Sequence, residues 1–423
     1  KYKLGEILDV TRGASLSGEY YATEGEYIRL TCGNFDYQNN CFKENKSKDN
    51  LYYVGDFKSE FLMEEGDIIT PLTEQAIGLL GSTAIIPESG KYIQSQDVAK
   101  IICKEDLLDK DFAFYLISSA LVKQQLSAAA QQTKIRHTSP DKIKDCTVWI
   151  PELSEQKRIG KLLRSIDRKI ELNRAINQNL EAMAKQLYDY WFVQFDFPNE
   201  NGRPYKSFGG KMVWNEKQRK YIPEYWEVKS LSNWLEIKSG FPFKSETYKP
   251  IGRYKIITIK NVQDGELVTS GCDYVNDIPS RAKDYISLQI GDRLISLTGN
   301  CGRLCVVCEE NLLLNQRVGL LCCDAIYLEY FYNFLNSGTM RTVIDNLANG
   351  AAQANLSPVE LCKTDCFIPP IDILLSYNRK VNAIRKAIVQ NNQEISQLAK
   401  QRDELLPLLM NGQVSVNSDL SDG

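Results

Sequence analysis

The chain has 423 residues, and its 51 Lys and Arg against 54 Asp and Glu give a formal net charge of -3. This length predicts two or three domains, and 43% hydrophobic with 25% charged residues exclude wholesale disorder. There is no long apolar run and no signal-peptide pattern, so we expect a cytoplasmic protein without a membrane span. The near-neutral balance lacks the basic footprint that usually marks a nucleic-acid binder.

Cysteine and histidine limit the chemistry further, with 12 Cys and a single His, His137. We expect reduced thiols, because nothing indicates secretion. Cys305 and Cys308 have a spacing that could begin a zinc site. However, residues 303–308 have the pattern of a buried strand, in which Cys acts as a small hydrophobic residue. The sequence therefore predicts no metal site and disfavours His-based catalysis.

The two halves of the chain repeat one another. Gly13 recurs as Gly240, 227 positions later, and Tyr27, Thr31 and Asn34 recur at the same offset as Tyr254, Thr258 and Asn261. Ser139-Pro140 recurs as Ser357-Pro358 and Ile150-Pro151 as Ile368-Pro369, both 218 positions later. Internal self-similarity of this kind indicates a duplicated architecture.

Each copy begins with a mixed part and ends in a long helix. Short β-type runs are expected at 27–30, 67–70, 84–86, 255–259 and 293–297, followed by helical stretches at 112–131 and 328–347. The predicted fold class is α+β, with two similar mixed α/β domains in a pseudo-twofold arrangement. The expected boundaries are 1–151 for domain 1, 152–197 for a central helix, 198–223 for a linker, 224–370 for domain 2, 371–412 for a second helix and 413–423 for a polar tail.

The long helices carry a heptad seam, because apolar or small residues alternate at spacings of four and three. The seam comprises Ile159, Leu163, Ile166, Ile170, Asn173, Asn177 and Leu180 in the first copy and Val381, Ile384, Ile388, Asn391, Ile395 and Leu398 in the second. Arg402 is its single break. We expect the two seams to pair as an intramolecular antiparallel coiled coil. Packing of each helix on its own domain, or pairing between two chains, are the alternatives.

No catalytic motif stands out. There is no Walker loop, nucleophile elbow or zinc-protease motif. Asp141, Glu155 and Lys157 loosely fit a Mg²⁺-dependent nuclease, in which carboxylates hold the metal and a lysine assists water attack. The structural explanation is stronger, because Asp141 follows a Ser-Pro turn and Glu155 opens the long helix, where an acidic residue favours the helix dipole.

Two similar domains on rigid helices suit a partner with two separated sites along one axis, as duplex DNA offers. Arg and Lys match guanine, and Asn and Gln match adenine, in the major groove. Candidate base-reading residues lie in polar loops of both copies: Arg12, Gln75, Gln94, Gln96, Lys134, Arg136, His137, Lys238, Lys244, Lys260, Asn300, Arg303, Asn315, Gln316 and Arg317. Residues 1–150 carry 17 basic and 22 acidic groups, and residues 198–371 carry 20 and 19, so we expect no segment to be strongly basic.

The sequence resembles the DNA-specificity subunits of type I restriction–modification systems. The similarity is carried by the helix start at 151–159, by the stretches 167–173 and 180–184 leading to Trp191-Phe192-Val193-Gln194-Phe195, and by the domain entry at 222–228. The second helix start departs from the family pattern, since Pro369-Pro370 is not followed by a Glu-Gln pair.

The resemblance implies a non-catalytic subunit in which each domain reads one half of a bipartite DNA target and the helices set the spacer. Two methylation subunits and motor-nuclease subunits would be the partners. These partners would bring S-adenosylmethionine, ATP and Mg²⁺, and the chain itself would bind no cofactor. The remaining alternatives are the nuclease built on Asp141, Glu155 and Lys157, and a scaffold that binds proteins rather than DNA.

Overall fold

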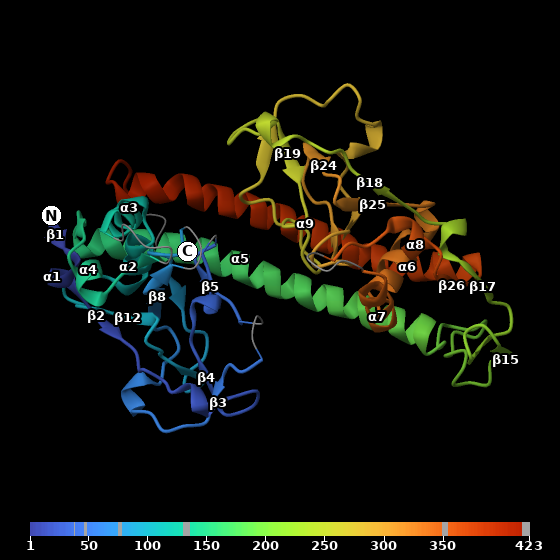
Figure 1. Cartoon of the computed structure of the whole chain (residues 1–423), viewed down its shortest axis with the longest axis horizontal. Coiled ribbons are helices and arrows are strands. Elements are labelled where there is room, and N and C mark those ends of the chain that lie inside the picture. The colour runs from blue at the N-terminus through green and yellow to red at the C-terminus, as the bar shows by residue number, and fades with distance from the viewer. Residues whose placement is uncertain (38, 46–48, 75–77, 130–135, 349–353, 417–423) are drawn as a thin grey trace. The chain divides into compact units, whose positions relative to one another are not determined.

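The computed structural model describes residues 1–37, 39–45, 49–74, 78–129, 136–348 and 354–416 (Figure 1). The chain divides into two compact units. Unit 1 comprises Lys1–Lys169 with Leu398–Gly423, and unit 2 comprises Ile170–Gln397. Each unit therefore holds one mixed domain together with parts of both long helices.

Unit 1 contains two four-stranded sheets. The first has the order β10-β8-β12-β2, formed by β2 (Leu8–Arg12), β8 (Ile68–Pro71), β10 (Ala84–Ile85) and β12 (Val98–Cys103). The second has the order β11-β4-β7-β3, formed by β3 (Tyr21–Ala22), β4 (Tyr27–Arg29), β7 (Tyr52–Tyr53) and β11 (Tyr92–Ile93). Smaller pairs join β1 (Tyr2–Lys3) to β14 (Thr147–Val148), β5 (Phe35–Asp36) to β6 (Cys41–Phe42), and β9 (Thr73–Glu74) to β13 (Arg136–His137).

Unit 2 repeats the strand order of the first sheet and three strands of the second, whereas the fourth strand of its second sheet joins the opposite edge. Its first sheet, β18-β25-β22-β23, comprises β18 (Glu236–Ser239), β22 (Arg293–Ser296), β23 (Leu304–Val306) and β25 (Val318–Cys322). Its second sheet, β20-β19-β24-β21, comprises β19 (Tyr254–Ile257), β20 (Asp273–Val275), β21 (Ser287–Leu288) and β24 (Leu312–Leu314). The pair β17 (Glu227–Ser230) with β26 (Asp365–Ile368) matches β1 with β14. In each second sheet one pair is parallel, β4 with β11 and β19 with β24, so the duplication extends to strand direction.

The residues that repeat in the sequence shape the backbone. A Cβ on Gly13 would lie 2.3 Å from the Gln94 carbonyl oxygen, and one on Gly240 would lie 2.1 Å from that of Leu314, so only glycine fits this close approach. Asn34 accepts a hydrogen bond from the Thr31 amide at 2.9 Å, and Asn261 accepts one from Thr258 at 2.8 Å. The Thr-x-x-Asn repeat is therefore a buried turn.

Buried residues of the short helices share a hydrophobic core with residues of the first sheet and of the long helices in each unit. In unit 1 the short helices are α1 (Leu4–Ile7), α2 (Lys110–Ile117), α3 (Ala120–Ala129) and α4 (Pro140–Lys144), and in unit 2 they are α6 (Ala325–Leu335), α7 (Gly338–Leu347) and α8 (Pro358–Cys362). The single helices expected at 112–131 and 328–347 are each two helices in the described residues. The Ser119 and Ser337 hydroxyls accept from the amides of Val122 and Met340, so each begins a new helix.

The two long helices are α5 (Leu153–Tyr188), extended by the π-helical turn η4 (Asp189–Val193), and α9 (Ile371–Met410). They run antiparallel. In unit 1 Asp167 pairs with Arg402, and in unit 2 Asn173 donates to Glu394 at 2.8 Å and Asn177 donates to Asn392 at 2.8 Å. The expected α+β class with an intramolecular coiled coil is confirmed, and the described helices also pack on their own domains.

The seam residues differ in burial. Ile159, Leu163, Ile170, Asn173, Val381, Ile388 and Ile395 are buried, whereas Ile166, Asn177, Leu180, Ile384, Asn391 and Leu398 are half-buried. Ile159 and Leu163 join the core of unit 1, and Val381 joins that of unit 2. Arg402, the expected break, is 8% exposed and is held by Asp167, so an ion pair fills that place in the seam.

The segment expected to be a linker contains a hairpin of β15 (Met212–Asn215) and β16 (Lys220–Pro223). The strand expected around 303–308 is β23. Cys305 within this strand and Cys308 after it are buried, and burial raises the pKa of the Cys308 thiol to about 11. No helix among the described residues is long and apolar enough to cross a membrane.

Candidate nucleic-acid interface

In unit 1 the candidate residues gather at one end of the first sheet. Arg12 ends β2, is exposed, and donates from Nε to the carbonyl oxygen of Gln96 at 2.8 Å. Gln96 is exposed in the turn between β11 and β12. Strand pairing of β2 with β12 brings the Arg12 side chain to the backbone of Gln96 although 84 residues separate them.

The same sheet end extends to β9 and β13. Thr73 Oγ1 lies 3.4 Å from Asp97 Oδ1 and 3.3 Å from His137 Nδ1, and His137 is exposed. The fold therefore joins Arg12, Gln96 and His137 into one polar edge. Thr73 and Asp97 belong to this edge and were not among the candidates. Thr73 lies near the end of a predicted strand and Asp97 follows Gln96 in the sequence, and these positions could have identified both as candidates.

Other candidates of domain 1 are placed differently. Gln94 is 1% exposed, and its Nε2 donates to the carbonyl oxygens of Thr11 and Val98 at 2.8 and 3.0 Å, so its amide is used inside the fold. The Arg136 backbone pairs with Glu74. Gln75 and Lys134 lie outside the described residues.

Unit 2 builds the equivalent edge from equivalent strands. Gln316 and Arg317 are exposed in the turn between β24 and β25. The Gln316 amide donates to the Phe241 carbonyl, and the Arg317 carbonyl accepts from the Leu297 amide, both at 3.0 Å. Asn315 is only 8% exposed. This turn corresponds to the turn that carries Gln94 and Gln96 in unit 1.

Three further candidates surround this turn. Lys238, near the end of β18, is half-buried, and its Nζ lies 3.4 Å from a Glu236 carboxylate oxygen. The Ser296 hydroxyl donates to the Asn300 carbonyl at 2.6 Å and accepts from the Arg303 amide at 2.9 Å. Since the amide of the next residue, Leu297, donates to Arg317, the loop carrying Asn300 and Arg303 adjoins the turn.

Lys244 and Lys260 lie apart from this edge in their contacts. Lys244 is exposed and precedes the short 3-10 helix η6 (Ser245–Thr247). Lys260 donates to the Gly271 carbonyl at 3.2 Å and lies 3.8 Å from an Asp273 carboxylate oxygen, next to the second sheet. No described contact links either lysine to the turn at 315–317.

The side chains of both edges are suited to hydrogen bonding. Guanidinium and amide groups can donate to and accept from the edges of base pairs in the major groove. Among the described residues, no group of three or more His, Cys, Asp and Glu side chains could hold a metal ion. The edges therefore offer hydrogen-bonding groups without a metal centre in the described part.

Glu155, the central residue of the nuclease alternative, is engaged in structural contacts. Glu155 accepts from the Val416 amide at 3.0 Å and pairs with Arg158. Burial raises the pKa of Glu155, but the Val416 amide and Arg158 outweigh it and lower the pKa overall. Asp141 and Lys157 are exposed. Glu155 thus joins the start of α5 to the segment that follows α9.

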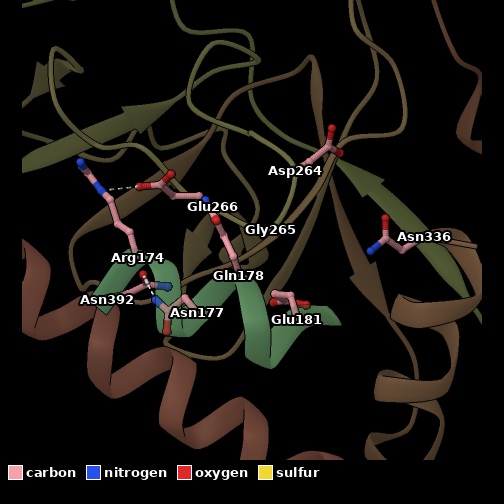
Figure 2. Close-up of a pocket in the computed structure, with 9 residues that line it drawn as sticks. All are labelled: Arg174, Asn177, Gln178, Glu181, Asp264, Gly265, Glu266, Asn336 and Asn392. Atoms are coloured by element: carbon pink, nitrogen blue, oxygen red, sulfur yellow. Dashed lines mark hydrogen bonds and ion pairs between the residues drawn. The ribbon is translucent and has the colours of Figure 1, made fainter. Parts of the chain in front are cut away.

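A cavity of about 290 Å³ in unit 2 is lined by more acidic than basic side chains (Figure 2). It lies between the two long helices and the loop around Gly265. Figure 2 shows Arg174 beside Glu266, with Nε 3.7 Å from Oε1, and Asn177 bonded to Asn392. Three carboxylates, those of Glu181, Asp264 and Glu266, line it against one guanidinium. This lining repels phosphate, so the cavity is no candidate for the DNA interface.

Comparisons with known proteins agree with this architecture. Residues 1–182 match the family described as the type I restriction modification DNA specificity domain. The MjaIX specificity subunit of Methanocaldococcus jannaschii is 25% identical over 332 residues, which are 76% of this chain and 73% of that protein. The HindI specificity subunit of Haemophilus influenzae is 23% identical over 375 residues, which are 76% of this chain and 81% of that protein.

A solved structure has the same fold. The type I restriction–modification S subunit from M. genitalium superposes with a TM-score of 0.55 at 16% sequence identity, covering 96% of this chain and 95% of that one. The duplicated sheets, the paired helices and the sequence relatives agree with one another. Residues 1–182 match the DNA specificity domain, and over most of its length the chain is similar to the specificity subunits of type I restriction–modification systems.

Proposed function

We propose that this chain is a specificity subunit that reads a bipartite DNA sequence, one half with each domain. The supporting observation is the repeated polar edge. Arg12, Gln96 and His137 in unit 1 and Gln316 and Arg317 in unit 2 come from equivalent strand ends and turns. A duplicated reading surface carrying different side chains suits two unlike half-sites, because different side chains match different bases.

The long helices act as the spacer in this proposal. A helix rises about 1.5 Å per residue, so its length sets a fixed distance along the chain. The buried Arg402–Asp167 pair and the Asn173–Glu394 bond specify one helix register, since a shift would leave polar groups unpaired. The length of the helices then determines the number of unread bases between the half-sites.

The subunit itself performs no chemistry in this proposal. Two methylation subunits dock on it and supply S-adenosylmethionine and adenine methylation, and motor-nuclease subunits supply the ATP- and Mg²⁺-dependent steps. The complex works in the cytoplasm. The isolated chain is expected to bind DNA weakly, because the 17 basic and 22 acidic residues of 1–150 offer little phosphate attraction.

The test combines target mapping with variants of each edge. Methylome mapping of the host should yield a split, adenine-methylated motif that disappears when the gene is deleted. R12A/Q96A should relax the bases of one half-site only, and Q316A/R317A those of the other, by about 5- to 150-fold per position since a bidentate contact discriminates by about 1–3 kcal/mol. K58A and R281A, which change exposed cations of the same domains, are the matched controls.

A different experimental result would refute each part of the proposal. An unsplit motif, or edge variants that leave both half-sites unchanged, would refute the two-reader assignment. Inserting about four residues, roughly one helical turn, in both α5 and α9 should lengthen the unread spacer. An unchanged spacer would refute the role of the helices. A complex that methylates DNA without any sequence preference would favour a protein scaffold.

A further inference from the structure

The segment that follows the first long helix is strongly basic. Residues 198–223 hold six Lys and Arg and two Glu, a net charge of +4, which leaves -7 for the rest of a chain whose total is -3. The average over 198–371 conceals this excess. The cations are Arg203, Lys206, Lys211, Lys217, Arg219 and Lys220. All of them except Lys220 are exposed.

The hairpin in this segment includes the strand labelled β15 in Figure 1. Its two faces carry different side chains. Directly opposed residues share a face, and faces alternate along each strand. Val213 pairs with Ile222 on the inner face, where both join the core of unit 2. Trp214 pairs with Tyr221 on the outer face, with ring centroids 5.2 Å apart, and these residues are 49% and 60% exposed.

The inner face is held firmly. Lys220 lies 4.1 Å from the centroid of the Phe367 ring and 5.3 Å from that of Phe195, and burial lowers the pKa of its ammonium group. The outer face is therefore presented by a fixed support rather than by a loose loop. It combines two large exposed rings with cations.

The cations differ in how they are used. Lys211 pairs with Glu224, and Arg203 lies over the Phe208 ring with 5.5 Å to its centroid. Among the described residues, Lys206, Lys217 and Arg219 make no ion pair and remain available to an anion. Lys217 and Arg219 sit in the turn between Asn215 and Lys220, next to the paired rings.

We propose that this basic hairpin is a sequence-independent DNA contact, separate from the base-reading edges. Lys206, Lys217 and Arg219 bind phosphates, and the Trp214–Tyr221 face packs on deoxyribose of a duplex or stacks on an unpaired base. Exposed lysines favour DNA over a protein partner, because lysine is depleted at protein–protein interfaces. The inference rests on the proposed function, which brings DNA to the subunit. The hairpin would supply part of the phosphate attraction that domain 1 lacks.

The experiment measures binding of the full-length chain to fluorescent DNA by anisotropy between 50 and 200 mM salt. The probes are a duplex of arbitrary sequence, a single strand of the same length, and a duplex carrying the mapped target. K206Q/K217Q/R219Q should weaken duplex binding about 10-fold or more and reduce the salt slope by up to about 2.7, since each phosphate contact contributes about 0.9. K380Q/K386Q/K400Q, which neutralises three exposed lysines of α9, is the matched control and should change neither quantity.

The aromatic face is tested separately with W214A/Y221A. Weaker binding to both arbitrary probes indicates packing on the backbone, and weaker binding to the single strand alone indicates stacking on bases. Unaltered thermal melting of each variant establishes that the hairpin remains folded. A salt slope and affinity unchanged in the triple variant, or lost equally in the control, would overturn the proposal.

Two further outcomes separate this inference from the proposed function. The triple variant should weaken target and arbitrary duplex alike, which preserves their ratio in a complex reconstituted with the methylation subunits. If the unsubstituted complex binds target and arbitrary duplex equally well, target reading is refuted, and the proposed role of the hairpin is unaffected. Weaker assembly with those subunits at an unchanged salt slope would assign the hairpin to a protein partner and overturn DNA binding.

Discussion

The two units attach the long helices to their domains at the same position of the repeat, with charges of opposite sign. Asp167 of α5 and Arg385 of α9 are 218 residues apart, the offset that relates the ends of the two domains. In unit 1 Asp167 accepts from the Tyr115 hydroxyl of α2 and from Arg402 Nη1 at 2.9 Å. In unit 2 Arg385 pairs with Glu181 of α5 and, at 3.3 Å, with Glu329 of α6.

The difference shows what a buried position in a duplicated scaffold requires. It does not require one residue type, because an acid and a base are equally tolerated when each finds partners of the opposite charge. The cluster of unit 2 is the more extensive. Arg293 also pairs with Glu329, and the Arg385 guanidinium lies 4.6 Å from the centroid of the Tyr332 ring. Burial opposes the charge of Arg385, but Glu329 outweighs it and raises the pKa of the guanidinium.

The largest expected effect follows from removing Arg385. R385M leaves Glu329, which is 3% exposed, with one cation instead of two, and leaves Glu181 without this partner. We expect the free energy of unfolding of unit 2 to fall by about 3–5 kcal/mol, the usual cost of an uncompensated buried charge. Urea denaturation followed by circular dichroism checks this. R379M, at an exposed site of α9, is the control, and a loss below about 1 kcal/mol would contradict the proposed role of Arg385.

Removing Arg402 should cost less. R402M leaves Asp167 with the hydrogen bond from Tyr115. Of the two carboxylates that pair with Arg402, that of Asp403 is exposed and needs no partner inside the fold. We therefore expect a loss of about 2–3 kcal/mol in unit 1, below that of R385M. Hydrogen exchange of α2 and α3 measured by mass spectrometry should report it in unit 1. Equal losses from R402M and R385M would show that the size of the cluster does not matter.

The sequence predicted the scaffold well because its signals are local or repeated. The seam needs only spacing, and the duplication needs only matched positions such as Gly13 with Gly240. The interruption at Ser119 and Ser337 was missed, because a helix cap in an otherwise helical pattern is a weak signal. Arg402 was interpreted as a break, since its partner Asp167 is distant in sequence and only the antiparallel pairing brings them together.

The candidate site was less predictable. Residue type alone could not separate Gln94, whose amide binds two carbonyl oxygens inside the fold, from Gln96 two positions later, whose side chain is exposed. Which side chain faces solvent depends on strand register and on the approach of β2. The basic hairpin was hidden for another reason: its charge was averaged with the acidic residues of domain 2.

The two acids that bind Arg385 should respond differently to neutral substitution. Burial raises the pKa of Glu329, but Arg385 and Arg293 outweigh it and lower the pKa below its ordinary 4.5, whereas burial dominates at Glu181 and raises its pKa. E329Q should therefore cost about 2 kcal/mol and E181Q less than about 1 kcal/mol at pH 7. Denaturation midpoints of the two variants check the order, and a larger loss from E181Q would contradict it.

The same pair gives a pH dependence. A carboxylate whose folded pKa lies below its unfolded value stabilises the fold fully above the unfolded value, and this contribution is lost as the pH falls through the folded pKa. The stability difference between the unsubstituted chain and E329Q should therefore be constant above about pH 5 and shrink below pH 4.5. The E181Q difference should not shrink in this way, because the pKa of Glu181 is shifted in the opposite direction. Urea titrations from pH 3.5 to pH 7 measure both differences.

The smallest effect comes from the tyrosines that adjoin the two clusters. Tyr115 donates its hydroxyl to Asp167, but the buried hydroxyl of Tyr332 has no hydrogen-bond partner among the described residues. Y115F should cost about 1–1.5 kcal/mol because it removes a hydrogen bond to a charged group, whereas Y332F should be neutral or slightly stabilising because it removes a buried polar atom without a partner. The same one-atom deletion is thus expected to destabilise unit 1 but not unit 2. Thermal melting of both variants measures it, and an equal loss in the two would show that the Tyr332 hydroxyl makes a compensating contact, so that the two clusters differ in charge but not in their hydrogen bonding.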